Sequence, residues 1–483
     1  MFRHRRIAIG AAAIVALACA TIAPVASAQS SGAVKINPAM SGMMQSVLRI
    51  RNAQAGRAVA SIAAPTSPAS LVNNPATDLT SQDTQSETTV VFSGGTQAVA
   101  AFNDSGAFSG ASPHFTGYSY SANNGKTWTD KGTLPTDAIG DAGDPSLAFD
   151  SLRSKVYLVT LGLNNSSVLR LFTSTDGGQT FGAAINPAPG NTASAFLDKE
   201  WLTVDNTAGA GQGNAYLAYR DFGSSGGMKF NRSVDGGVTW SNAINLLPND
   251  GQGAWVTVGP DHAVYYFFLA GAANQIKVRK SVDQGVTFAP AVLVVDLLTT
   301  GVNGDLTLGG GFRGNAFPQA VVGLDGVIYV VYNDNPAGVD KGDVFLKTST
   351  DGGTTWSAAT KVNDDLATAD NWQPSVALNT AGTRIAVGYY DRSADPANLL
   401  IQRRIRTGTV GVGGAITFNA SKSLSPSFPA VIGQDPVINT TYMGDYDQIA
   451  GTGVGFLTVW GDNRDSDTAH AHQPDVRRAL VKA

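Results

Sequence analysis

The stretch Ser174-Thr-Asp176-Gly-Gly178-Gln-Thr180-Phe181 decides the fold, because its pattern recurs along the chain. Ser-x-Asp-x-Gly-x-Thr-aromatic returns at residues 233–240, 281–288 and 349–356, and a copy at 121–128 has asparagine in place of aspartate. The copies begin 53, 59, 48 and 68 residues apart. Repeats of this length are typical of architectures built from small identical sheets. We therefore expect an all-β propeller with one four-stranded antiparallel blade per repeat.

Each copy has the composition of a tight turn. The Asp or Asn side chain can accept hydrogen bonds from main-chain N–H groups, and glycine permits a positive φ. The aromatic residue then returns the chain to the core. We interpret Asp176, Asp235, Asp283 and Asp351 as structural residues and not as catalytic ones.

Short runs that alternate apolar and polar residues surround the repeats and predict the inner two strands of each blade. The predicted pairs are 89–93 with 97–102, 146–149 with 155–160, 201–204 with 215–219, 255–258 with 263–268, 319–322 with 327–332, 375–378 with 384–389, and 446–450 with 455–460. The last two pairs have no copy of the repeat, so the blades outnumber the copies. Seven blades are expected, and six blades with one pair outside the ring is the alternative.

The last blade requires a strand from elsewhere in the chain. A third strand is predicted at 475–480, after which the chain ends. Near the other end, Ser70-Leu-Val-Asn-Asn74 resembles Thr360-Lys-Val-Asn-Asp364 of an earlier blade. Because an open ring would leave unpaired strand edges, we predict that residues 69–74 supply the outer strand of the last blade.

Composition excludes several classes of protein. The 483 residues include 55 glycines and one cysteine, with 14% charged residues and a net charge of −4. No basic cluster suggests binding to nucleic acid or to an anionic membrane. The lone Cys19 excludes a disulfide scaffold, a zinc knuckle and thiol catalysis.

The beginning of the chain predicts export. A basic start, an apolar stretch and the site Ala26-Ser27-Ala28 indicate a signal peptide over residues 1–28, and hence a secreted or periplasmic protein. No other apolar run approaches the length of about 18 residues that spans a bilayer. Residues 29–65 are expected to be a flexible or loosely docked leader, although residues 38–59 could form one amphipathic helix. Residues 66–483 are expected to be a single propeller domain, and the protein a monomer.

In such a ring the starts of first strands and the ends of second strands meet on one face, the top, where loops vary most. The polar and aromatic residues predicted there are Glu87, Asn103, Asp104, Asp144, Asp198, Lys199, Glu200, Arg220, Asp221, Gln252, Arg313, Gln319, Asn333, Asp334, Trp372, Gln373, Asp391, Arg392, Tyr442, Asp445, Tyr446, Asp462 and Arg464. The chain contains only two glutamates, and both are in this set.

The repeat is the Asp-box, and the chain resembles the sialidase-type Asp-box (BNR repeat) β-propeller superfamily. Sialidases hold the carboxylate of an anionic sugar with three arginines, attack with a tyrosine assisted by a glutamate, and use an aspartate as acid. The resemblance implies that Arg220, Arg392 and Arg464 form the arginine cluster. It also implies that Tyr442 or Tyr446 is the nucleophile, Glu200 its base, and Asp104 or Asp221 the acid. The chain departs from sialidases in its seven blades and in having no arginine between Arg57 and Arg153.

Two functions remain open from the sequence. The first is a binding or scaffold protein whose top face engages a glycan, a cell-surface polysaccharide or a protein. The second is a glycoside hydrolase or polysaccharide lyase that acts on acidic sugars. No cofactor is required, although calcium suits the oxygen ligands of Asp141–Asp144 or Asp462–Asp467. His114, His470 and His472 are a weaker candidate set of metal ligands, since exposed loops also explain them.

Overall fold

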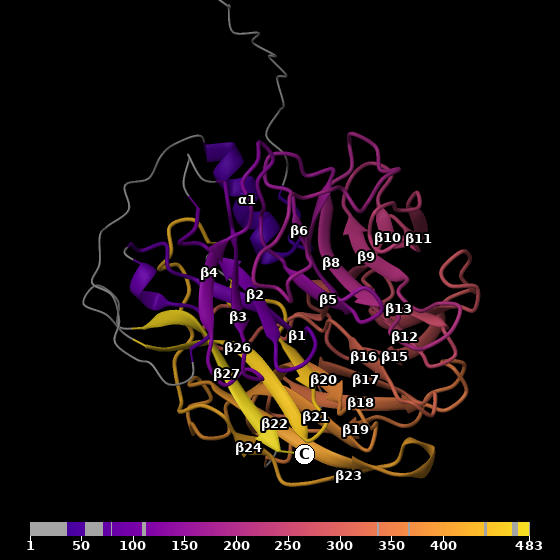
Figure 1. Cartoon of the computed structure of the whole chain (residues 1–483). Coiled ribbons are helices and arrows are strands. Elements are labelled where there is room, and N and C mark those ends of the chain that lie inside the picture. Colours follow the sequence, from indigo (N-terminus) through magenta and orange to yellow (C-terminus); the bar gives the residue numbers. More distant parts are fainter. Residues whose placement is uncertain are drawn as a thin grey trace, which may run out of the picture. The chain divides into compact units, whose positions relative to one another are not determined.

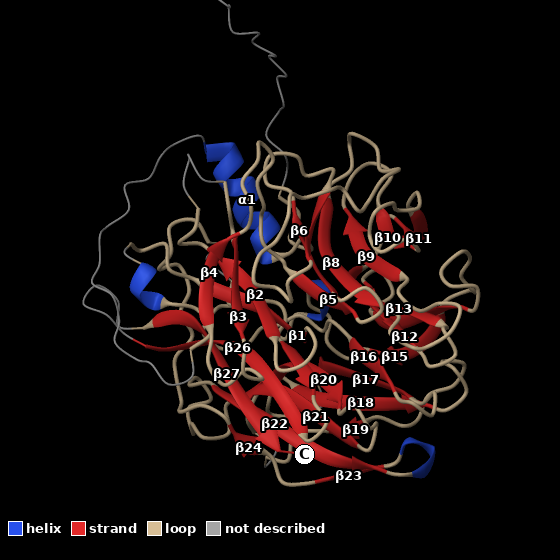
Figure 2. Ribbon diagram, viewed as in Figure 1, coloured by secondary structure: helices blue, strands red, loops and turns tan. Residues whose placement is uncertain are grey.

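The strands form seven small sheets arranged around a ring (Figures 1 and 2). The computed structural model describes residues 36–53, 71–78, 80–108, 113–335, 338–365, 368–438, 442–465 and 472–482. The predicted signal peptide lies outside these ranges. Residues 36–483 belong to one compact unit.

Each sheet is one antiparallel blade whose strands follow one another in chain order. Blade 1 contains β1 (Gln85–Phe92), β2 (Ala98–Asp104), β3 (Thr116–Ser121) and β4 (Thr129–Thr133). Blade 2 contains β5 (Ser146–Asp150), β6 (Lys155–Leu161) and β7 (Leu169–Ser174). Blade 3 contains β8 (Leu197–Val204), β9 (Ala215–Asp221), β10 (Gly227–Ser233) and β11 (Ile244–Pro248). In blade 2 the outer position is held by Ile185, which forms a single bridge with Leu171.

The remaining blades repeat the plan. Blade 4 contains β12 (Gln252–Val258), β13 (Val264–Ala270), β14 (Gln275–Ser281) and β15 (Val292–Asp296), and blade 5 contains β16 (Gln319–Val322), β17 (Ile328–Asp334), β18 (Asp343–Ser349) and β19 (Thr360–Lys361). Blade 6 contains β20 (Asn371–Leu378), β21 (Arg384–Asp391), β22 (Gln402–Val410), β23 (Ile416–Phe418) and β24 (Lys422–Ser423). Blade 7 contains β25 (Gln448–Gly451), β26 (Gly455–Asp465) and β27 (Gln473–Lys482). The helices are α1 (Gly42–Ala53) and the 3-10 turns η1 (Pro75–Thr77), η2 (Val302–Gly304) and η3 (Val412–Gly414). No helix in the described ranges is long and apolar enough to cross a membrane.

The first strands of the blades line the ring. β1 contacts β5, and the series continues through β8, β12, β16, β20 and β25, which returns to β1. All seven predicted inner pairs are present as antiparallel ladders. The seven-bladed prediction is therefore confirmed, and the six-bladed alternative is wrong.

The ring is closed by the segment predicted for this role. Leu71 bridges Arg477 of β27, and the N–H of Val72 donates to the Val476 carbonyl at 2.9 Å. Figure 1 shows β26 and β27, in yellow, beside the purple strands of blade 1. The Asn73 amide donates to Asp475 at 2.8 Å and accepts from the N–H of Val476 at 2.9 Å.

The same contact recurs in blade 5, which explains the sequence likeness between the two segments. Asn363 donates to Asp343 at 2.6 Å and accepts from the N–H of Val344 at 3.0 Å. The closing segment thus takes the place of an ordinary fourth strand.

The eight-residue repeat folds into the same turn in each copy. At 281–288, the N–H of Gly285 donates to the Ser281 hydroxyl at 2.8 Å, and Asp283 accepts from the N–H and the hydroxyl of Thr287 at 2.9 and 2.6 Å. Matching bonds form in the other copies. Hydrogen bonds from Thr287 lower the pKa of Asp283 to about 2. The aspartate is therefore fully engaged by its own turn.

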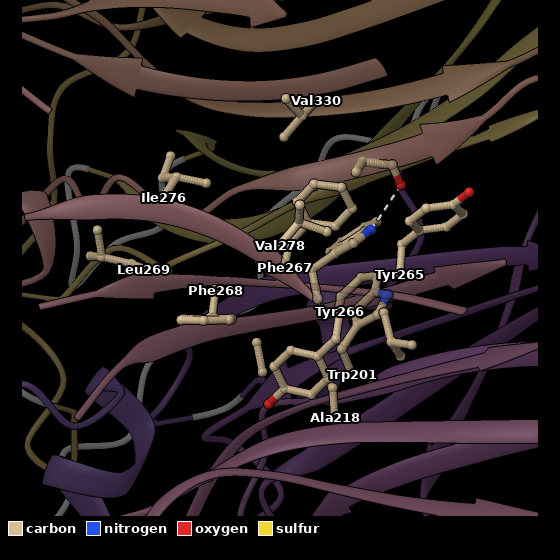
Figure 3. Close-up of a cluster of buried hydrophobic side chains, with 14 of the residues drawn as sticks. Trp201, Ala218, Tyr265, Tyr266, Phe267, Phe268, Leu269, Ile276, Val278 and Val330 are labelled. Carbon is tan, nitrogen blue, oxygen red and sulfur yellow. Dashed lines mark hydrogen bonds between the residues drawn. The ribbon is translucent and has the colours of Figure 1, made fainter. Parts of the chain in front are cut away.

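Alternate side chains of the strands pack on opposite neighbours. Along β13, Tyr266 faces Phe230 of blade 3, while Phe267 faces Trp356, the aromatic residue of a repeat in blade 5. Figure 3 shows part of this cluster, with Tyr266 on the side of Trp201 and Phe267 directed toward Val330. Burial of such large rings between blades stabilises this region.

Helix α1 lies within the segment expected to be a flexible or loosely docked leader. Met43, Met44, Val47 and Leu48 are completely buried, and the Ser41 hydroxyl caps the helix by accepting from the N–H of Met44 at 3.0 Å. Residues 40–48 are thus buried in the protein, whereas residues 37 and 38 are exposed. Residues 29–35 and 54–65 of the expected leader lie outside the described residues.

Candidate functional site

The first strands begin with a backbone irregularity that re-aims side chains. The top of the ring is defined as the end at which the first strand of each blade begins. Register shifts interrupt the starts of β1, β8, β12 and β20. The residues with positive φ at the starts of first strands are Glu87 (51°), Asp144 (56°), Lys199 (51°), Gly253 (64°) and Gln373 (51°). A positive φ is uncommon for a residue with a side chain, and such strain gathers at functional positions.

Ionisable groups concentrate at this end of the ring. The top cluster consists of five buried carboxyl groups and two cations, which are Glu87, Asp144, Asp198, Glu200, Asp445, Lys199 and Arg313. Burial raises the pKa of Glu87, Asp144, Asp198 and Glu200. Carboxyl groups outnumber cations in this cluster and are removed from water, which disfavours their charged forms.

Glu87 and Asp144 form a carboxyl pair beside a tyrosine. Glu87 lies beside the Asp144 carboxyl group and the Tyr442 hydroxyl, and both groups lower its pKa against the larger effect of burial. Asn103 holds the three groups together: its amide donates to Tyr442 at 2.8 Å and to Glu87 at 3.3 Å, and its carbonyl accepts from the N–H of Asp144 at 2.8 Å. Among the described residues, no N–H or O–H donor of another residue reaches the Asp144 oxygens. Burial and the negative charge of Glu87 raise the pKa of Asp144 well above its usual value.

The second glutamate has a different environment. Within the described part of the chain, no N–H or O–H of another residue reaches either oxygen of Glu200, and burial raises its pKa well above the usual value. The neighbouring Lys199 ammonium lies 3.3 Å from the centre of the Tyr446 ring. The Tyr446 hydroxyl donates to the Pro145 carbonyl at 2.8 Å. The Tyr446 ring thus binds the Lys199 ammonium through a cation–π contact, whereas Tyr442 is the tyrosine whose hydroxyl lies beside a carboxyl group.

A second part of the top cluster is neutralised. Arg313 forms a two-pronged ion pair with Asp445, with one N–H to oxygen distance of 3.0 Å. Asn315 adds a hydrogen bond to the same carboxylate at 2.9 Å. Asp198 accepts from the Gln252 amide at 2.9 Å. The uncompensated charge therefore resides on the side of Glu87, Asp144 and Glu200.

The opposite end of the channel is chemically different. It holds a cavity of about 550 Å³ lined by the last residues of the first strands, including Phe92, Val204, Val322 and Leu378. No top-cluster residue lines this cavity. The ionisable chemistry and the open space thus lie at opposite ends of the channel.

The three arginines predicted to form a cluster are separated. Arg220, Arg392 and Arg464 follow or end strands of blades 3, 6 and 7, and in the described ranges no hydrogen bond or ion pair brings two of them to one carboxylate. Their main partners are the ring of Phe222 at 4.5 Å, Asp370 at 3.3 Å and Asp462 at 2.7 Å. The expectation of an arginine cluster is corrected, because each arginine is captured by a neighbour within its own part of the ring.

The two candidate acids also lie apart from the carboxyl pair. Asp221 accepts from the main-chain N–H groups of Phe196 and Gly223, both at 2.8 Å, and is therefore part of a turn. Asp104 is contacted by the Gln85 amide at 3.4 Å, and burial followed by the charge of Asp130 raises its pKa to about 6. Neither has a hydrogen bond to Tyr442.

The sequence assigned one site to residues that the structure brings together only in part. Glu200 is a member of the top cluster, and Tyr442 and Tyr446 lie beside its members Glu87 and Lys199. Glu87 and Asp144 were predicted for the top face without a role, although their position at the starts of first strands was the available signal. Asn103 has no catalytic signature in the sequence and is recognised only by its contacts.

Some of the side chains that were expected to bind calcium or another metal already have hydrogen-bond partners in the protein. Asp141 accepts from the N–H of Phe115 at 2.9 Å and pairs with His114. His472 contacts the Asn463 carbonyl at 3.0 Å, whereas His470 and part of Asp462–Asp467 lie outside the described residues. Where the chain is described, no three His, Cys, Asp or Glu side chains are arranged to hold a metal ion.

Comparison with known proteins gives similarity at the level of solved structures. No family model matches the chain. No curated protein matches it either. A Hadza microbial sialidase is similar over 73% of this chain and 68% of its own, with 17% identity and a TM-score of 0.47.

Two further solved structures are similar. An α-L-arabinanase of Penicillium chrysogenum, complexed with arabinobiose, matches over 69% of this chain and 94% of its own, with 14% identity and a TM-score of 0.44. A protein of unknown function from Dyadobacter fermentans matches over 75% and 98%, with 16% identity and a TM-score of 0.44.

Proposed function

We propose that the protein is an exported, sialidase-like Asp-box propeller that hydrolyses glycosidic bonds at the top cluster. The observation that carries the proposal is the buried pair of Glu87 and Asp144 beside the Tyr442 hydroxyl. Burying two carboxyl groups together is costly in a structural role, and perturbed pKa values are typical of catalytic groups. The signal-peptide pattern of residues 1–28 supports export.

The three groups supply a nucleophile, a base and an acid. Tyr442 attacks the anomeric carbon while its phenol proton passes to Glu87, and Asp144 gives its proton to the oxygen of the leaving sugar. The glycosidic C–O bond breaks as the tyrosyl–sugar bond forms. Water then releases the sugar, with the Asp144 carboxylate accepting its proton and Glu87 returning a proton to Tyr442. Burial raises the pKa of Tyr442 well above its usual value, so the nucleophile needs the adjacent base.

The charge of the cluster favours a neutral glycan over an acidic one. Of the two cations, Arg313 is already paired with Asp445, and Lys199 lies against the Tyr446 ring. A carboxylate-bearing sugar would meet uncompensated carboxyl groups without an arginine clamp. The proposal therefore replaces the acidic substrates expected from the sequence with neutral ones.

A second candidate function is binding of a protein segment without catalysis. Side chains of the top cluster and its neighbours hold main-chain groups of residues 39–41, as described below. The same contacts would serve a peptide from a partner protein. This reading retains the binding protein expected from the sequence.

Hydrolysis assays on a panel of neutral and sialylated oligosaccharides test the proposal. We expect release of sugar from neutral substrates and a loss of roughly 100-fold or more in kcat/KM for Glu87→Gln, Asp144→Asn and Tyr442→Phe. Asp283→Asn, which alters a turn remote in role from the site, is the control and retains activity. If no substrate is hydrolysed under conditions in which the site is open, or if the three variants keep full activity, the hydrolase proposal is wrong.

A further inference from the structure

We propose that residues 36–48 are a built-in inhibitor, which occupies the top cluster and must leave before a substrate enters. The consequence for catalysis rests on the function proposed above. Displacement of the segment, however, is measurable without any substrate.

The segment is held through its main chain by side chains of the ring. The Ala39 carbonyl accepts from the amides of Gln252 and Asn303, both at 2.9 Å. The Met40 carbonyl accepts from Arg313 at 2.7 Å. Polar groups that face the top of the channel are thus satisfied by this segment in the manner expected for a bound ligand.

The beginning of α1 meets the carboxyl groups directly. The N–H of Ser41 donates to Asp198 at 2.7 Å. A helix N-terminus carries a partial positive charge, so its position beside Asp198 is electrostatically favourable. The cluster itself therefore supplies part of the attraction that holds the segment.

Close contact places the segment against the proposed nucleophile. A Cβ atom on Gly42 would lie 1.8 Å from Cδ2 of Tyr442, a distance that no side chain tolerates. Met43 packs against Gly143, which directly precedes Asp144 of the carboxyl pair. A Cβ atom on Gly143 would lie 2.9 Å from Cγ of Met43. A sugar cannot reach Tyr442 while this packing persists.

The ring does not need the segment to be complete. Helix α1 pairs with no strand, and the closing contacts come from Leu71 to Asn73. Its buried side chains include Met40, Met43 and Met44, and methionine adapts easily to different surfaces. Glu200 and Asp144 remain without N–H or O–H donors beneath the segment, so the segment satisfies the site only in part.

Gly42→Ala in the full chain tests the inference. Alanine favours a helix over glycine by about 1 kcal/mol, so a loosened segment reports the clash with Tyr442 and not a weaker helix. We expect hydrogen exchange at amides 42–48 to accelerate at least 10-fold while the blade strands stay protected. A labelled peptide of residues 36–53 should bind the variant and not the wild type. Arg49→Ala, at an exposed position on the same helix, is the matched control and should behave as wild type.

A second route avoids substitution at the contact. A specific protease site placed between residues 60 and 66 allows the segment to be cut after folding. We expect the cut segment to dissociate, and the added peptide to restore protection.

The outcomes separate this inference from the proposed function. If the exchange rates do not change in Gly42→Ala, or if the blade strands lose protection together with the segment, the inhibitor is wrong. Equal hydrolysis by the wild type and by a chain whose segment has left would also overturn it. If the segment leaves and its peptide rebinds but no glycan is ever cleaved, the inhibitor stands over a binding site and the hydrolase proposal falls.

Discussion

Among single residues, Asp104 shows how a candidate acid differs from a catalytic one. Burial first, and then the charge of Asp130, raises its pKa to about 6. Its contacts lead to Gln85 and not to Tyr442. A raised pKa is therefore insufficient to assign a role, because the carboxyl group must also face the reacting atoms.

Asp104→Asn should make stability less dependent on pH. A carboxyl group whose folded pKa is raised contributes stability that is present below its unfolded pKa, near 4, and is lost as the pH rises through about 6. We expect the variant to match the wild type near pH 4 and to be more stable at pH 8, by about 1–3 kcal/mol. Urea unfolding at both pH values measures this difference. Equal destabilisation at both would show that the Asp104 hydrogen bonds outweigh its burial.

At the scale of elements, the repeated turn and helix α1 illustrate what sequence reasoning can reach. The turn is local: Ser281, Asp283 and Thr287 complete one another's hydrogen bonds within a few residues, so its role follows from spacing alone. The docking of α1 is not local. Gly42 looks like a weakness in a helix, but the ring of Tyr442 requires the absence of its side chain.

The turn predicts a graded response to substitution of Asp283. Asp283→Ala removes the acceptor for the N–H of Thr287 and should lower the free energy of unfolding by about 1 kcal/mol. Asp283→Asn should cost less, because Asn123 makes the same contact with Thr127 at 2.9 Å in its own copy. Thermal unfolding of both variants measures the order, and equal losses would contradict it.

Acid should act on the same turn. Hydrogen bonds from Thr287 lower the pKa of Asp283 to about 2, so the contribution of the carboxylate is present above pH 4 and is lost as the pH falls through about 2. The Asn variant lacks this dependence. Its difference from the wild type should therefore shrink between pH 5 and pH 2, and a constant difference in melting temperature would argue against the assignment.

For the whole molecule, the blade count and the closing strand were predictable and the arginine positions were not. Strands are recognisable in the sequence by the alternation of apolar and polar residues, and Asn73 could be matched to Asn363 because the two short segments are similar. Arg220, Arg392 and Arg464 were correctly placed near strand ends. Their separation, however, depends on which blade each occupies and on neighbours such as Asp370, which a strand position does not specify.

Closure of the ring should dominate global stability. Val72 is 1% exposed and packs between the first and last blades, whereas Val412 is fully exposed. Val72→Ala should lower the free energy of unfolding by about 1–3 kcal/mol, and the same change at position 412 should have almost no effect. Chemical unfolding of the pair measures the difference. Similar values would show that the closing segment is dispensable.

The same closure sets a schedule for synthesis. Asn73 and Asp475 are 402 residues apart in the chain, yet they form one hydrogen bond. At a translation rate of about 5–20 residues per second, the first of them waits roughly 20–80 s for the second. During that interval the early segment has no partner, because the last blade has not yet been made. The nascent chain must therefore remain protected from premature association until Asp475 has been made.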